Sequence, residues 1–139
     1  MRSSFYYTLF LFSLVGLGSC ENDIELKSDE AELLIGNWIS PVYIDTLVQY
    51  TRSEALIEND YGISFSSGNT LVERQNAGWC GTPPISFANY NGTWSKIGDI
   101  IDINVDFWGG KVNHKWKVIA IDPNTLTINP VKSEYIYKE

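Results

Sequence analysis

The sequence predicts an all-β domain whose strands close into an up-and-down antiparallel barrel. Of the 139 residues, 44% are hydrophobic and 19% are charged, which is typical of one globular domain. From Leu33 onward apolar and polar residues alternate, as in half-buried strands, and short turn-forming segments separate the runs. About eight strands in an open sheet would expose two edges, so we expect closure around an interior that holds side chains or one small ligand.

The clearest strands lie near the C-terminus. Residues 99–108 place Ile101, Ile103, Val105 and Phe107 on one face, and Gly109-Gly110 supplies a tight turn. The chain is expected to return through 111–122, to turn at Pro123-Asn124, and to continue with Leu126 and Ile128 facing inward. Further strands are predicted at 134–138, 62–73 (a hairpin), 87–95, 42–50 and around Trp38. Residues 53–58 are the only predicted helical turns.

Charge and cysteine content exclude several classes of protein. The chain has 10 Lys plus Arg against 17 Asp plus Glu, a net charge of −7, which argues against nucleic-acid binding through a basic surface. Two cysteines and one histidine cannot build a disulfide-rich scaffold or a four-cysteine zinc site. We therefore predict no metal and no cofactor.

The N-terminal segment is typical of a signal peptide. Arg2 precedes an almost wholly apolar run over 5–17, which is too short to span a bilayer as a helix. The run ends in Leu17-Gly18-Ser19-Cys20, which resembles the lipobox of bacterial lipoproteins. That resemblance implies that residues 1–19 are removed and that Cys20 is lipidated, which anchors the protein to a membrane. The alternative is a secreted protein whose Cys20 pairs with Cys80.

Residues 20–32 are polar and strongly acidic, and we interpret them as a solvated tether between the lipid and the domain. Their composition is similar to the acidic leader of surface lipoproteins from Bacteroidetes-type bacteria. The expected location is accordingly the cell envelope, with the anchor in the outer membrane.

Short motifs across residues 33–130 resemble those of small bacterial lipocalin-like domains. Gly36-Asn37-Trp38 is similar to the Gly-x-Trp opening strand of lipocalins, and 63–68, 91–95 and 116–128 are similar to later strands and turns. The resemblance implies a lipocalin-like barrel over 33–139, with Trp38 buried at its floor. The Gly-Trp-Cys-Gly-Thr-Pro-Pro segment at 78–84 departs from the pattern.

No catalytic constellation accompanies this fold, so we do not expect an enzyme. His114 shares a strand face with Val112 and Trp116. Two interpretations remain open: a structural or surface histidine whose hydrogen bonds are satisfied, and a histidine with a functional role. For Cys80 a buried structural role is the preferred interpretation, because no local cation or helix start would activate its thiol. The aspartates are interpreted as a solvated face rather than a metal or glycosidase cluster: Asp99, Asp102, Asp106 and Asp122.

Two functions from different classes remain open. The first is a lipid-anchored envelope protein that holds a small apolar or amphipathic ligand inside the barrel. Its predicted contacts are the inward residues Phe65, Trp94, Ile103, Val105, Phe107, Trp116 and Val118. The second is a protein-interaction or inhibitor module that uses the 78–84 loop, with Trp79 and Trp108 as exposed contacts.

Overall fold

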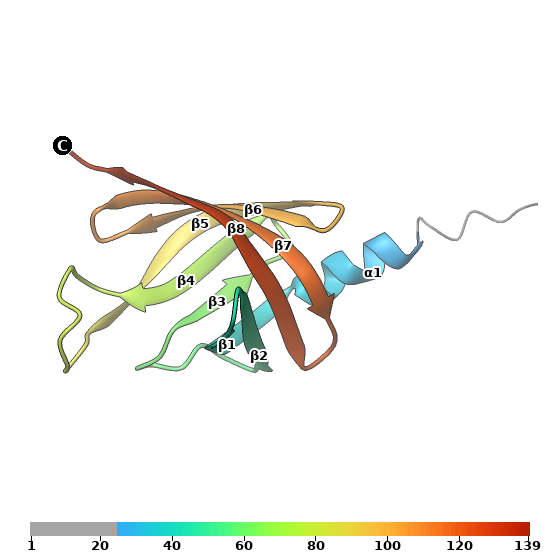
Figure 1. Ribbon diagram of the computed structural model, residues 1–139, viewed down its shortest axis with the longest axis horizontal. Coiled ribbons are helices and arrows are strands. Elements are labelled where there is room, and N and C mark those ends of the chain that lie inside the picture. Colours follow the sequence, from blue (N-terminus) through green and yellow to red (C-terminus); the bar gives the residue numbers. More distant parts are fainter. Residues whose placement is uncertain (1–24) are drawn as a thin grey trace, which may run out of the picture.

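The predicted eight-strand antiparallel barrel is confirmed by the computed structural model, which describes residues 25–139 (Figure 1). One helix, α1 (Glu25–Leu34), precedes the strands. The strands are β1 (Gly36–Ile44), β2 (Leu47–Ser53), β3 (Gly62–Phe65), β4 (Thr70–Asn76), β5 (Phe87–Ile97), β6 (Ile100–Phe107), β7 (Gly110–Ile121) and β8 (Thr125–Tyr137). Every strand has a neighbour on both sides, so the sheet has no long open edge.

The strand order follows the sequence except near the start. Strands β3 to β8 are consecutive neighbours, whereas β1 lies between β2 and β3, and β2 closes the barrel against β8. The closing register pairs Val48 with Ile128 and Tyr50 with Leu126. The connection from β2 to β3 therefore passes β1, and these two strands are not neighbours.

One end of the barrel is closed by α1 and by a buried tryptophan. Leu34 and Trp38 are both 0% exposed, and Trp38 Nε1 donates a hydrogen bond of 2.8 Å to the Leu34 carbonyl. Arg52 lies 4.2 Å from the centre of the Trp38 ring and donates to the carbonyls of Leu33 and Ile35. A guanidinium on the last carbonyls of a helix satisfies groups that have no partner within the helix. The predicted burial of Trp38 is confirmed.

Helix α1 differs from the expected tether. Residues 20–32 were interpreted as a solvated acidic segment, but the chain is helical from Glu25. The reason lies in tertiary contacts: Leu34 enters the core, and Lys96 Nζ pairs with Glu30 Oε2 at 3.1 Å. The helix predicted at 53–58 is wrong, because this segment ends β2 and continues without helical structure.

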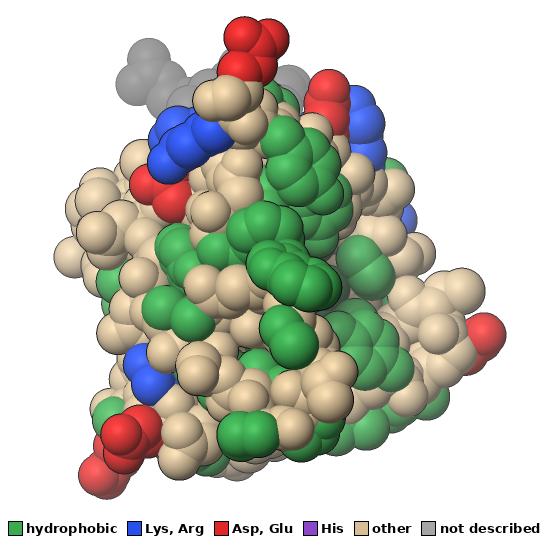
Figure 2. Space-filling model, turned by 90° about the vertical axis from the view of Figure 1, so that its left-hand side faces the viewer, with side chains coloured by type: hydrophobic (Ala, Val, Ile, Leu, Met, Phe, Trp, Pro, Cys, Tyr) green, Lys and Arg blue, Asp and Glu red, His purple; other side chains and the backbone are tan. Residues whose placement is uncertain are grey.

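The other end of the barrel is open and carries the longest loop, 77–86, between β4 and β5 (Figure 1). The β6–β7 turn and the C-terminal end of β8 lie at the same end. Figure 2 looks onto this end, where hydrophobic side chains gather over the middle of the face and charged side chains lie toward its periphery. We call this end the mouth. Among the described residues, no helix is long and apolar enough to cross a membrane.

The core runs through the barrel interior from Leu34, the last residue of α1, to Phe107 and Val112, beside the β6–β7 turn. The alternation predicted for 101–107 is confirmed, since Ile101, Ile103, Val105 and Phe107 are at most 5% exposed. The opposite face of β6 carries aspartates paired with lysines of β7, as in Asp102–Lys115 at 3.0 Å. The interpretation of these aspartates as a solvated face is therefore confirmed.

Candidate functional site

A pocket of about 290 Å³ lies in the mouth half of the barrel. This volume is at the lower end of the range typical for small-molecule sites. Its aromatic lining consists of Tyr43, Tyr50, Tyr61, Trp116 and Tyr135, and its aliphatic lining of Val48, Ile128 and Pro130. Its polar lining consists of Glu73, Gln75, His114 and Ser133. Such a mixed lining suits an amphipathic ligand rather than a wholly apolar one.

Strand alternation explains the polar contribution of β4. Leu71 is 2% exposed and belongs to the core, so Glu73 and Gln75, at steps of two along the strand, face the interior as well. Across the ladders Glu73 pairs with Ile63 of β3 and Tyr90 of β5. Ile63 is 1% exposed, which confirms that Glu73 lies on the inner face of the sheet.

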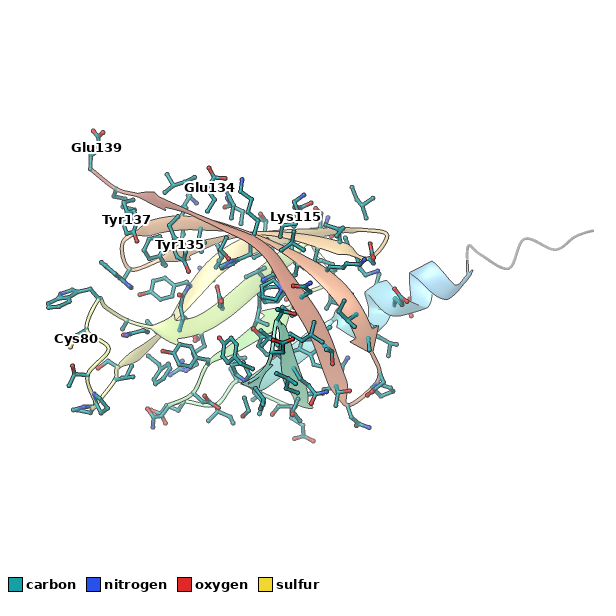
Figure 3. All side chains as sticks on the ribbon, viewed as in Figure 1. Cys80, Lys115, Glu134, Tyr135, Tyr137 and Glu139 are labelled. Atoms are coloured by element: carbon teal, nitrogen blue, oxygen red, sulfur yellow. The ribbon has the colours of Figure 1, made fainter. Side chains whose placement is uncertain are left out.

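Two β-bulges turn additional aromatic side chains toward the pocket. The register of β1 against β2 shifts between Ile39 and Val42, so Tyr43 shares the inner face with Trp38 although the two are five positions apart. In β8 a similar shift opposite Lys115 and Trp116 brings Ser133 and Tyr135 inward. Figure 3 shows the side chains of Tyr135 and Glu134 on opposite sides of β8.

Aromatic packing holds one wall of the pocket. The rings of Tyr50 and Trp116 are stacked, with centres 5.9 Å apart and planes at 27°. His114 lies beside Trp116, with ring centres 6.0 Å apart, and its Nδ1 is 2.7 Å from Ser133 Oγ. His114 is therefore hydrogen-bonded and also faces the pocket, and burial lowers its pKa, so the ring is neutral at pH 7.

The carboxyl group of Glu73 dominates the electrostatics of the pocket. It has some contact with the pocket solvent but is otherwise surrounded by protein, and this burial raises its pKa to about 7. Burial also raises the pKa of the Tyr50 hydroxyl, and the charge of Glu73 adds to that rise. Glu73 accepts a hydrogen bond of 3.3 Å from Gln75 Nε2. Near neutral pH the carboxyl group is thus poised between its charged and neutral forms.

Only one of the seven predicted ligand contacts lines this pocket. Trp116 does so, whereas the other six are core residues that pack with one another: Phe65, Trp94, Ile103, Val105, Phe107 and Val118. Phe65 and Trp94, for example, meet edge to face with ring centres 5.3 Å apart, toward the closed end. Phe107 does not line the pocket itself. Its ring packs against that of Tyr135, a lining residue, with ring centres 5.5 Å apart.

The residues predicted for the alternative function are exposed. Trp79, on the 77–86 loop, is 82% exposed, and Trp108, in the β6–β7 turn, is 45% exposed. The prediction that Cys80 is buried is wrong: it is an exposed free cysteine on the same loop (Figure 3). The loop projects from the barrel, so Cys80 has no core in which to be buried.

Two other hollows lie outside the mouth of the barrel in the part of the chain that the structure describes. One of about 310 Å³ lies over β5, β6 and β7, and its lining includes the exposed Asp102 and Asn104 together with the predicted contacts Trp94 and Ile103. The other, of about 490 Å³, lies beside α1 and is lined, among the described residues, by Glu32, Leu33, Arg52 and Pro123. Among the side chains that the structure describes, residues 30–139, no group of three potential His, Cys, Asp or Glu ligands could hold a metal ion. The mouth pocket is therefore the candidate functional site.

Comparison of the chain with family models, with curated proteins and with solved structures finds no significant match. The lipocalin and lipoprotein resemblances consequently remain predictions from short motifs. Cys20 and the signal peptide lie outside the described residues.

Proposed function

We propose that this protein binds a small amphipathic ligand in the mouth of its barrel and presents that site from a lipid anchor in the cell envelope. The observation that carries the proposal is the pocket of about 290 Å³, which is built from five strands and the segment before β3 and borders the packed core. Eight of its twelve lining side chains are aromatic or aliphatic, and the other four are polar. Ligand sites commonly combine an apolar wall with a few polar groups that fix orientation.

The position of α1 supports the anchoring part of the proposal. The helix lies at the closed end of the barrel, opposite the mouth (Figure 1). The lipid expected on Cys20 would therefore attach at the end away from the ligand entrance. A ligand could then reach the mouth without displacing the anchor.

The test compares two substitutions of adjacent residues on β8. Ser133 faces the pocket, so Ser133→Trp should fill the mouth, whereas Glu134→Trp adds the same side chain to the outer face, where Glu134 pairs with Lys132 at 2.9 Å. Native mass spectrometry of each protein, purified without a tag from its own cells, measures bound small molecules. We expect the wild type and Glu134→Trp to retain a small-molecule mass and Ser133→Trp to lose it.

A wild type that carries no such mass, or a Ser133→Trp variant that retains it, would overturn the proposal. Thermal unfolding of the three proteins confirms that the barrel is intact in each. Because Ser133 is exposed, the added ring should not require repacking of the core.

The exposed Trp79 favours a second candidate function, a protein-interaction module. An indole that is 82% exposed on a projecting loop is the kind of side chain that anchors interfaces. In the same spectra a bound protein mass that disappears in Trp79→Ala would favour this function.

A further inference from the structure

The pocket places an acidic group among aromatic rings without a basic partner. Five ion pairs occur among the described side chains of residues 30–139, and Glu73 takes part in none of them. Its hydrogen-bond donor, Gln75 Nε2, is neutral and is shared with the Asp106 carbonyl, also at 3.3 Å. Glu73 is half-buried, and a carboxylate that loses part of its hydration without gaining a cation is destabilised.

Nearby basic side chains are directed elsewhere. Arg74, next along β4, is on the outer face, where it donates to Asn89 Oδ1 at 2.7 Å and to the Glu58 carbonyl. Arg52 is bound to carbonyls at the closed end. His114 faces the pocket but is neutral at pH 7 because burial lowers its pKa.

The groups that face Glu73 from the surrounding strands are hydroxyls and rings rather than charges. Tyr43 of β1, Tyr50 of β2 and Tyr135 of β8 all line the pocket, and Tyr90 of β5 is opposite Glu73 in the ladder. Aromatic faces attract cations through the negative charge density of the ring face. The negative charge and the ring faces thus favour the same kind of ligand group.

We infer that the ligand is a small amine whose ammonium group pairs with Glu73 and whose apolar part packs against the stacked Tyr50 and Trp116. This inference rests on the proposed function and specifies the ligand class of the same pocket. An ammonium group would supply the missing countercharge and three hydrogen-bond donors for Glu73 and the nearby hydroxyls. An anionic ligand would be repelled by the negative charge of Glu73, and a neutral ligand would leave that charge without a countercharge.

Three probes that share an indole ring and differ in their end group test the inference: tryptamine, tryptophol and indole-3-acetate. Calorimetric titration at pH 8 measures the affinity of each for the wild type and for Glu73→Gln, with Glu134→Gln as a matched exterior control. A charge-assisted pair corresponds to about 10- to 100-fold in affinity. We expect tryptamine to bind the wild type about 10- to 100-fold more tightly than tryptophol, and indole-3-acetate to bind most weakly.

Glu73→Gln should abolish the preference for tryptamine, and Glu134→Gln should leave it unchanged. If tryptophol binds as tightly as tryptamine, or if Glu73→Gln preserves the preference, the amine inference is overturned while the pocket remains a ligand site. If none of the three probes binds, the amine inference is likewise overturned, and the small-molecule mass retained by the purified protein decides the proposed function separately.

Discussion

Replacing Glu73 by glutamine should make the barrel more stable at high pH and leave it unchanged at low pH. Burial raises the pKa of Glu73 from 4.5 to about 7 in the folded protein. Between these values the folded state binds more protons than the unfolded state, so the free energy of unfolding falls as the pH rises. Glutamine has nearly the same shape as glutamate and cannot ionise. The free energy of unfolding of the variant should therefore not show the fall with rising pH that Glu73 causes.

The size of the effect follows from the change in pKa. At 1.36 kcal/mol per pKa unit, the rise from 4.5 to about 7 corresponds to at most about 3 to 4 kcal/mol at pH 8. Contact of the carboxyl group with pocket water makes this value an upper bound. Below pH 4.5 both states carry a protonated Glu73, so the wild type and the variant should be equally stable.

Urea unfolding from pH 4 to pH 8, followed by tryptophan fluorescence, measures the difference. Glu134→Gln is the control, because this exposed residue pairs only with Lys132 on the surface and such pairs contribute little. Stability curves of the wild type and Glu73→Gln that run parallel over this range would refute the claim that Glu73 is half-buried without a countercharge.

Three further predictions concern the core and the anchor. Trp38→Ala should cost about 3–5 kcal/mol in urea unfolding, because the ring is 0% exposed and hydrogen-bonded; a loss below about 1 kcal/mol would contradict its role at the floor. Val118→Trp should destabilise by about 1–3 kcal/mol in thermal unfolding, since Val118 is in the packed core, and unchanged stability would reveal space there. Cys20→Ser should move the protein from the membrane pellet to the soluble fraction, and its retention in the pellet would refute the lipid anchor.

The barrel itself could be predicted because its regular strands follow the two-residue period. From Ile101 to the end of β6 the apolar and polar residues alternate without exception, so the sequence alone assigns Ile103 and Val105 to the interior. Helix α1 was missed because its acidic composition is also typical of a solvated tether. What holds it is tertiary: Leu34 in the core and Arg52 on its final carbonyls.

The pocket was harder to predict because several of its residues do not follow the alternation of inward apolar and outward polar side chains. Bulges in β1 and β8 change which residues face inward, so alternation does not predict that Tyr43 and Tyr135 share the inner face. Glu73 and Gln75 lie on the same face of β4 as Leu71. Because they are polar, a prediction that assigns only apolar residues to the interior does not include them. His114 was placed correctly beside Trp116, and only the folded barrel shows that both line a pocket.

The most direct test of the account is the pKa of Glu73 itself, measured with and without an amine. Carbon-13 NMR of the side-chain carboxyl group, assigned by its absence in Glu73→Gln, follows its titration from pH 4 to pH 9. The account predicts a pKa of about 7 in the free protein and a fall of at least about one unit when tryptamine saturates the pocket, because the ammonium group favours the carboxylate. A pKa near 4.5 in the free protein, or one that tryptamine leaves unchanged, would contradict it.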